Sequence, residues 1–444
     1  MAEIAPFRAL RFAQDPLDKV LAPPYDVIDA KQRELLGDKS PHNIVHLDLP
    51  EGEGDARYEN AKQRLASWIA EGVLARDSKP SFLRYEQTFE PPEGGAPITR
   101  KGFFALVRAE QYDKRVVLPH ERTLSGPKED RYKLFCATAT ALSPVFLLYE
   151  DKANVVAGAL RISEAEEEIK TDDGIISRFA RVTDKASIAA IEKALSTSSL
   201  LIADGHHRYE TTLRYGTAID EERAKKGLPP APDGAHHFVL AFLADANDPG
   251  LLVFPTHRVV YGLAAVDREK FLADVKSLFD IRYVTEEPGP GRDSSQLLQL
   301  VAEAGKSSPS FAVYFKDKSK AILSLRKDAN IDAHPALSRI SPALRRTDVV
   351  LLHTGILESV LGITREQQAS QAHLRYWKQG GATLADVSNG DGQIAFLMNG
   401  TPVADVRRSC EAGEVMPQKS TFFYPKVPTG LVLHRLDPEE TIEF

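Results

Sequence analysis

Five polar or conformationally special residues follow one another at the start of a helix-like segment: Asp204, Gly205, His206, His207 and Arg208. The apolar run at 200–203 before them fits a short buried strand, and an Asp-Gly pair is typical of a tight turn. The first N–H groups of a helix have no intrahelical acceptor, and the helix dipole favours an anion beside them. Two imidazoles and a guanidinium add donors for phosphate oxygens. The stretch therefore predicts an anion or nucleotide site.

Asp204 allows three interpretations. Its carboxylate, at the end of the predicted strand, could cap the helix, hold a metal ion or accept a proton as a general base. The first interpretation needs no function, because an Asp cap is ordinary at a strand-to-helix junction. The imidazoles and the guanidinium that follow Asp204 favour the functional interpretations.

A second polar cluster follows a predicted strand that ends at Leu118: His120, Glu121 and Arg122. Binding residues are often carried by loops at the ends of strands. His120 and Glu121 could bind a divalent ion or move a proton, and Arg122 could hold a phosphate. A solvated, charged helix start is the alternative, and it accounts for the later charges at 128–133 better than for this cluster.

Two further segments place polar residues on a stiff loop or after a strand end. The prolines at 23 and 24 fix the backbone and remove two hydrogen-bond donors, which suits a pocket wall. They could equally do no more than turn the chain. We assign four residues of these segments to substrate binding: Tyr25, Asp26, His257 and Arg258.

Lys419-Ser420-Thr421 looks like the end of a Walker A motif. The glycines of that motif are missing, and an aromatic, strand-like run follows where a P-loop would open a helix. We therefore reject a P-loop. Lys419 and Ser420 could still contact a phosphate.

Helical and strand-like periodicities alternate along the remaining chain, so the predicted fold class is α+β (mixed α/β). A strand is expected at 41–50, with His46 and Asp48 on one face, and a helix at 344–361. Residues 1–262 are expected to form the core that carries the Asp204 site. Residues 263–444 are expected to be an α/β elaboration or second domain whose segment 413–432 returns to the site.

The composition and net charge of the chain exclude several classes of protein. The chain has 444 residues, 56 basic and 63 acidic, and a net charge of -7. This balance argues against a nucleic-acid partner. Two cysteines far apart in sequence fit a reducing compartment and exclude a Cys-rich zinc site. No apolar run is long enough to span a membrane, and no signal peptide is visible, so a cytoplasmic location is expected.

The polar segments together resemble an uncharacterised bacterial and archaeal family, domain of unknown function 1015. The resemblance lies in five stretches: Pro23 to Ile28, His120 to Thr123, Asp204 to Tyr209, His257-Arg258 and Met416 to Thr421. Separately, Asp-Gly-His-His-Arg after a strand resembles the ParB/sulfiredoxin superfamily, in the form found in free serine kinases, where the Asp is implicated in catalysis. This resemblance implies a ParB/sulfiredoxin-like nucleotide-binding core. A histidine stands where sulfiredoxin has its cysteine, which argues against sulfiredoxin chemistry.

The leading hypothesis is a nucleotide-dependent phosphotransferase, a small-molecule kinase, that acts on a hydroxylated metabolite such as free L-serine or a similar amino acid. The expected cofactors are Mg²⁺ and ATP or ADP, with Asp204 and Glu121 as metal ligands. Asp204, Glu121 and His120 are the expected catalytic residues. The expected phosphate contacts are Gly205, His206, His207, Arg208, Arg122, Lys419 and Ser420.

Two other functional classes stay open. One is a non-catalytic nucleotide- or phosphate-binding regulator of ParB-like type, and the other is a divalent-metal-dependent hydrolase or phosphatase. The expected partners are a phosphorylated small molecule and an amino-acid-like substrate, and a homodimer is compatible with the sequence.

Overall fold

The computed structural model describes residues 2–91, 95–121, 123, 125–161, 165–285, 293–417 and 419–444, which form two compact units. The first unit consists of Met1–Pro119, Thr123–Leu251 and Pro425–Phe444, and the second of His120–Arg122 and Leu252–Tyr424. The division thus falls between Leu251 and Leu252, where the sequence led us to expect it after residue 262. The last twenty residues belong to the first unit.

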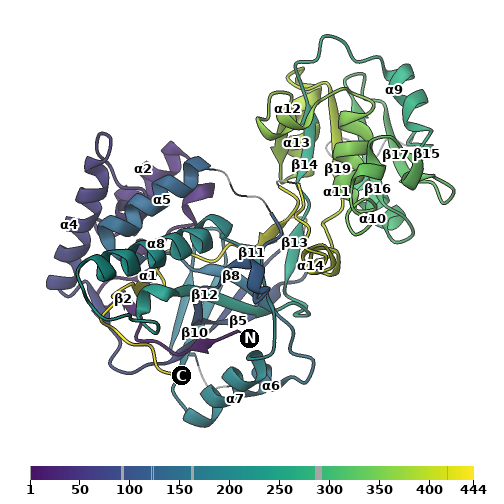
Figure 1. Cartoon of the computed structure of the whole chain (residues 1–444). Helices are drawn as coiled ribbons and strands as arrows, with labels where there is room; N and C mark the ends of the chain where they lie inside the picture. The colour runs from purple at the N-terminus through teal and green to yellow at the C-terminus, as the bar shows by residue number, and fades with distance from the viewer. Residues whose placement is uncertain are drawn as a thin grey trace. The chain divides into compact units, whose positions relative to one another are not determined.

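A nine-stranded mixed sheet forms the centre of the first unit (Figure 1). Its order is β6 (Val117–Leu118), β11 (Leu200–Asp204), β8 (Val145–Tyr149), β12 (Phe238–Asp245), β5 (Ile98–Arg108), β4 (Phe82–Phe89), β10 (Ile176–Val182) and β9 (Glu167–Lys170), with β1 (Ile4–Ala5) paired to β5. Strand β11 is parallel to β6 and antiparallel to β8, and β8 is parallel to β12. Because β12 is covered on both faces, seven of its eight residues are buried, as its continuous apolar run predicts.

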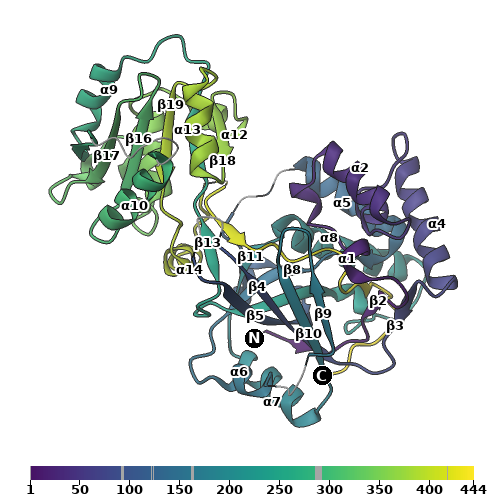
Figure 2. The ribbon, with the colours of Figure 1, turned by 180° about the vertical axis from the view of Figure 1, so that it is seen from behind.

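Helices of the first unit build two core clusters. One joins the sheet to α6 (Val155–Ala159), α7 (Lys185–Leu195) and the beginning of α8 (His206–Lys225). The other packs α4 (Ala56–Ala70) against α5 (Ser125–Thr138). In both views α4, α5 and α8 lie side by side (Figures 1 and 2). Short elements complete the unit: α1 (Leu17–Val20), η1 (Tyr25–Val27), α2 (Ala30–Lys39), α3 (Val45–Asp48), η2 (Tyr112–Lys114), η3 (Ala235–His237) and the strand pairs β2 (Leu10–Phe12) with β3 (Leu74–Arg76) and β7 (Thr140–Ala141) with β21 (His434–Arg435).

The second unit has its own antiparallel sheet, in the order β15 (Phe279–Tyr283), β17 (Lys320–Leu325), β16 (Ser310–Phe315), β19 (Ile394–Met398), β14 (His257–Val260) and β18 (Leu374–Trp377). Helices α10 (Asp293–Gly305) and α13 (Gly380–Ser388) pack on this sheet and on each other. A separate pair, β13 (Leu252–Phe254) and β20 (Phe422–Tyr424), joins the two ends of the unit's main segment. The remaining elements are α9 (Arg268–Val275), η4 (Ile331–Ala333), η5 (Leu337–Arg339), α11 (Asp348–Val350), η6 (Leu351–Glu358), α12 (Arg365–Ala369) and α14 (Val403–Glu411).

The predicted mixed α/β class is confirmed by these sheets and helices. The strand expected at 41–50 is wrong, because residues 45–48 form the short helix α3. The Asn43 side chain accepts a hydrogen bond from the Val45 N–H, which starts a helical turn. The expected helix at 344–361 is present in part, although residues 351–358 adopt the wider π geometry. Among the described residues, no helix combines the length and apolar character that crossing a membrane requires.

Gly102 in β5 allows a packing test. A Cβ atom there would overlap the Leu243 carbonyl oxygen and the Phe242 ring of β12. We expect Gly102→Ala to lower the free energy of unfolding by about 3 kcal/mol through overpacking. Gly158 in α6 has nothing near its would-be Cβ, so Gly158→Ala should be neutral or stabilising by about 0.5–1 kcal/mol. Urea denaturation of both variants measures the change in the free energy of unfolding. Equal changes in the two variants would contradict the β5–β12 packing described.

Candidate functional site

Strand β11, Gly205 and helix α8 form the strand-turn-helix that the sequence predicted. The pairing of β11 with β8 shifts register between Ile202 and Asp204, at the end of the strand. Gly205 has φ 93°, in the left-handed region, and occupies the N-cap position, where no side chain caps the helix. The first helical hydrogen bond runs from the Tyr209 N–H to the Gly205 carbonyl over 3.0 Å. The helix therefore begins directly after the Asp204 carboxylate, with a glycine in between.

Two cations hold the Asp204 carboxylate. Arg208, one turn into α8, donates to Oδ2, and the Lys426 ammonium donates to Oδ1. The Asp204 side chain is only 16% exposed, and burial alone would raise its pKa. Lys426 and Arg208 overcome this effect and hold the pKa of Asp204 well below its usual range. Asp204 is therefore ionised at neutral pH.

Arg208 is buried and positioned within the first unit. One Nη donates to Asp204 and the other to the Pro144 carbonyl oxygen, which lies just before β8. The guanidinium also lies 3.0 Å from the point where a Cβ on Gly205 would stand. In this arrangement Arg208 orients the carboxylate, and its predicted contact with a phosphate stays a prediction.

Reasoning from sequence pointed to Lys419 in the same C-terminal stretch and missed Lys426. A signal was present, since Lys426 lies between Pro425 and Pro428 and so on a stiffened segment, like Tyr25 and Asp26 after their two prolines. The Lys426 side chain is 15% exposed. It brings the C-terminal segment of the first unit to the end of β11.

Tyr25 of η1 lies beside a buried ion pair. Its ring is 4.2 Å from the Arg131 guanidinium carbon, and Arg131 donates to the buried Asp48 carboxylate over 2.8 Å. Burial raises the pKa of Tyr25 to about 12, opposed by Arg131 and Arg208, so its phenol keeps its proton. The neighbouring Asp26 is exposed. The sequence pointed to Asp48 as part of a strand face and to Arg131 as a phosphate contact, but it did not reveal that the two pair beside Tyr25.

His206 is buried and His207 is half-buried in the first turn of α8. Burial lowers the pKa of His207, against the opposing charges of Glu210 and Asp26, which favours its neutral form at pH 7. One turn further, the Glu210 carboxylate accepts hydrogen bonds from the Thr123 hydroxyl over 2.8 Å and the Lys128 ammonium over 3.0 Å. The beginning of α5 is thus tied to α8.

The second unit holds its own group of predicted site residues. His120 Nε2 lies 2.7 Å from the Thr421 hydroxyl, and the His120 carbonyl accepts from the Met416 N–H over 2.8 Å. The Glu121 carboxylate accepts from the Ser420 N–H over 3.2 Å. His120 and Glu121 are therefore held against residues 416–421. Arg122 lies outside the described residues.

His257 and Arg258 are buried in β14 of the second unit. Arg258 donates through Nε to His353 Nε2 over 3.2 Å and through Nη2 to the Lys419 carbonyl over 3.1 Å. Burial lowers the pKa of Arg258 to about 10 and, with Arg258 nearby, that of His257 to about 3. The side chains of His257 and Arg258 are both buried in the second unit. The Lys419 side chain is exposed, and only its carbonyl oxygen takes part in this network.

A π-helical residue completes this network. His353 in η6 shares a 2.8 Å hydrogen bond with the Gln368 side chain, and π-helical turns often occur at functional sites. Both residues line a cavity of about 600 Å³ within the second unit, together with Arg339, Ser341, Arg365, Tyr376 and Met416. No sequence pattern pointed to this cavity, because His353 lies in a largely apolar run.

The predicted site residues thus form three groups, one in the first unit and two in the second. The first unit brings together Asp204, Gly205, His206, His207, Arg208, Tyr25 and Asp26 around the beginning of α8. The second unit brings together His120, Glu121 and Ser420 in one group and His257, Arg258 and the Lys419 backbone in another.

Comparison with known proteins finds one family and several solved structures. Residues 4–350 match a family described as protein of unknown function (DUF1015). No curated protein matches the chain.

Three of the similar structures are as follows. A conserved hypothetical protein from Pyrococcus furiosus has 14% identity and a TM-score of 0.34, covering 77% of this chain and 97% of that one. A free serine kinase in complex with AMP has 14% identity and a TM-score of 0.34, covering 77% and 93%. SbnI with C-terminal truncation from Staphylococcus aureus has 10% identity and a TM-score of 0.35, covering 74% and 87%. At these scores the likeness carries no argument about the site.

Replacing Lys426 tests the ion pairs of Asp204. We expect Lys426→Met to lower the free energy of unfolding at pH 7 by about 2 kcal/mol, because the buried carboxylate loses one of two charged partners. The folded-state pKa of Asp204 is depressed, so this contribution is fully present above the unfolded pKa of about 4 and is lost as pH falls below it. Urea denaturation from pH 7 to pH 2 should show the two proteins converging in acid. A difference that stays constant with pH would contradict the assignment.

The glycines that flank α8 test the turn at its beginning. Gly205 and Gly227, which follows the helix, both have left-handed φ angles, 93° and 69°. An alanine costs about 1–2 kcal/mol in such a conformation. A Cβ on Gly227 meets nothing within 4 Å, whereas one on Gly205 approaches the Arg208 guanidinium. Gly205→Ala should therefore destabilise the protein by about 1 kcal/mol more than Gly227→Ala in urea denaturation. Equal losses would show that Arg208 is not fixed against Gly205.

Proposed function

The chain belongs to the family described as protein of unknown function (DUF1015), and we propose, from the first unit's site, that it is a nucleotide-dependent phosphotransferase. The donor is ATP or ADP and the acceptor is the hydroxyl group of a small metabolite. The Asp-Gly-His-His-Arg motif, which resembles that of the free serine kinases, makes L-serine or a similar amino acid the first acceptor to test.

One observation carries this proposal: a carboxylate held ionised between two cations stands directly before a helix whose N-cap residue is a glycine, without a side chain of its own to cap it. The helix start is suited to the oxygens of a phosphate. The carboxylate is suited to a hydroxyl group or a metal ion beside that phosphate. Adjacent residues of one turn are therefore suited to bind both the phosphate and the acceptor hydroxyl of a phosphoryl transfer.

Lys426 gives the proposal its mechanism. Phosphoryl transfer depends mostly on positioning and on stabilising negative charge. When a nucleotide phosphate binds at the beginning of α8, the Lys426 ammonium can turn from Asp204 to the phosphate oxygens. Asp204 then keeps Arg208 as its partner, gains basicity and accepts a hydrogen bond from the acceptor hydroxyl. His206 and His207 donate to the phosphate from the first turn of the helix.

The other groups of the first unit have supporting roles in this proposal. Mg²⁺ would supply charge neutralisation between phosphate oxygens, and the exposed carboxylate of Asp26 and the released oxygen of Asp204 are its candidate ligands. Tyr25, with its proton retained, is a hydrogen-bond donor or acceptor for the substrate. The predicted roles of His120, Glu121, Arg122, His257, Arg258, Lys419 and Ser420 remain predictions, and the proposal does not depend on them.

Nucleotide binding is the first test. We expect ATP and ADP, with Mg²⁺, to bind the full chain in isothermal titration calorimetry, and Lys426→Met to weaken binding about 10–100-fold through loss of one charge-assisted contact. Lys225→Met, at the far end of α8, is the matched control and should bind as the wild type does. Absence of binding to wild-type protein, or equal loss in both variants, would refute the proposal.

Turnover is the second test. With Mg²⁺ and either ATP or ADP, release of ADP or AMP respectively should depend on added L-serine and not on L-alanine, which has the same backbone groups without the hydroxyl. Asp204→Asn should abolish this dependence and still bind nucleotide. Nucleotide binding without any acceptor-dependent turnover across hydroxylated amino acids would favour a binding-only regulator over a kinase.

A further inference from the structure

A second group of chemically competent side chains lies at the other end of α8. Asp220 is in the fifth turn of that helix, and His236 and His237 form most of η3, just before β12. Fourteen residues of helix separate His206 from Asp220, a rise of about 21 Å. The group is therefore distinct from the site at Asp204, although both belong to the first unit.

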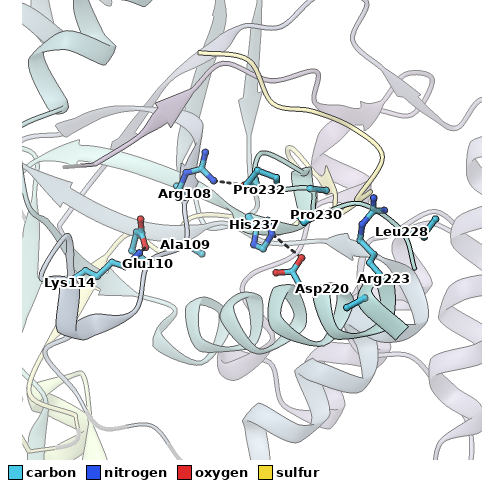
Figure 3. Close-up of a pocket in the computed structure, with 12 residues that line it drawn as sticks. Arg108, Ala109, Glu110, Lys114, Asp220, Arg223, Leu228, Pro230, Pro232 and His237 are labelled. Atoms are coloured by element: carbon cyan, nitrogen blue, oxygen red, sulfur yellow. Dashed lines mark hydrogen bonds and ion pairs between the residues drawn. The ribbon is translucent and has the colours of Figure 1, made fainter. Parts of the chain in front are cut away.

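The three side chains converge on one point. Nε2 of His236 lies 3.1 Å from Asp220 Oδ1, and Nε2 of His237 lies 3.2 Å from the same oxygen. Figure 3 shows the Asp220 carboxylate and the His237 ring facing each other. Consecutive residues of a 3₁₀ turn point about a third of a turn apart. Here the two rings nevertheless lie 4.0 Å apart and present the same nitrogen to the same carboxylate.

Their spacing matches a metal-binding triad. One ligand atom from each residue lies within 4.8 Å of the others. Tetrahedral zinc with bonds of about 2.0–2.1 Å separates neighbouring ligand atoms by about 3.3–3.4 Å. The observed 3.1 and 3.2 Å are thus within a few tenths of an ångström of two edges of such a tetrahedron, and the two histidine nitrogens lie within 4.8 Å of each other.

We infer that Asp220, His236 and His237 form a binding site for one divalent transition-metal ion, with Zn²⁺ as the best match. Two imidazole nitrogens and one carboxylate suit Zn²⁺ better than Mg²⁺ or Ca²⁺, which prefer oxygen ligands. Among the residues that the structure describes, this is the trio of His, Cys, Asp or Glu side chains with ligand spacing.

The burial of one ligand and the solvent exposure of the other two both favour metal binding at this site. His236 is fully buried, which fixes its ring, while Asp220 and His237 are 46% and 23% exposed, so an ion can reach them from solvent. Asp220 and His237 also line a pocket of about 450 Å³. Three protein ligands leave a fourth position for water or for a bound anion. The cations that border the pocket, Arg108, Lys114 and Arg223, are each paired with carboxylates, so the opening carries both signs of charge.

The metal would connect two elements that are joined by a loop. The chain leaves α8 after Lys225 and returns at η3, so an ion on Asp220 and the two histidines closes this connection onto the helix. The unfolded chain has no such arrangement of ligands, so binding stabilises the folded state.

Metal titration of the full chain, with any affinity tag removed, tests the inference. We expect one Zn²⁺ per chain by equilibrium dialysis with elemental analysis, and a rise in thermal unfolding temperature with added Zn²⁺ but not with Mg²⁺. Added Co²⁺ should give the visible absorption of a tetrahedral nitrogen and oxygen site. The free ions Zn²⁺, Co²⁺ and Mg²⁺ are the only probes needed.

Two partly exposed positions provide the variants, because the buried His236 is a risk to folding. Asp220→Asn keeps an oxygen that accepts hydrogen bonds from both rings and removes the charge that a metal needs, and His237→Asn removes one nitrogen ligand. Each should weaken Zn²⁺ binding about 100-fold or more, since loss of even an outer-shell partner costs about 10–100-fold. Glu221→Gln, the neighbouring charge change on α8, should bind as the wild type does. Zn²⁺ binding that is absent from the wild type, or equal in all four proteins, overturns the inference.

Discussion

A carboxylate with little access to water is stable only where opposite charges and hydrogen bonds replace its hydration. Asp204 meets this condition through Arg208 and Lys426, which come from the helix after it and from the last segment of the first unit. Three stretches of chain are therefore brought together by one charge requirement. The end of β11, the beginning of α8 and the segment that begins at Pro425 all meet at this carboxylate.

Ion pairs of this kind are expensive to desolvate, and well-packed apolar groups often give equal stability. Their benefit is fixed geometry, since a carboxylate bound on both oxygens cannot rotate. The second unit contains a comparable case, in which the buried Arg258 guanidinium is fixed by carbonyl oxygens and by His353. In each unit, residues that the sequence marked for ligand binding first serve to orient one another.

The predictable parts of the site are those that depend on neighbouring residues. The apolar run, the Asp-Gly turn and the helical spacing after Gly205 are local, and the structure has the strand, turn and helix at those residues. Lys426 is 222 residues from Asp204, and a pairing at that distance leaves no local pattern. The alternation at 41–50 misled because a segment this short fits a helical turn as well as a strand. The ion pair between Asp48 and Arg131, which are 83 residues apart, is again a long-range contact.

Lys426 also has a consequence for the order of events during synthesis. At about 5–20 residues per second, the ribosome makes Lys426 roughly 10–40 s after Asp204. Strands, helices and the whole of Leu252–Tyr424 are made in that interval. Until then Arg208 is the carboxylate's partner from its own neighbourhood, and the end of β11 lacks its second cation. The nascent protein thus reaches its final electrostatic state only when its last segment joins the first unit, whatever has already folded.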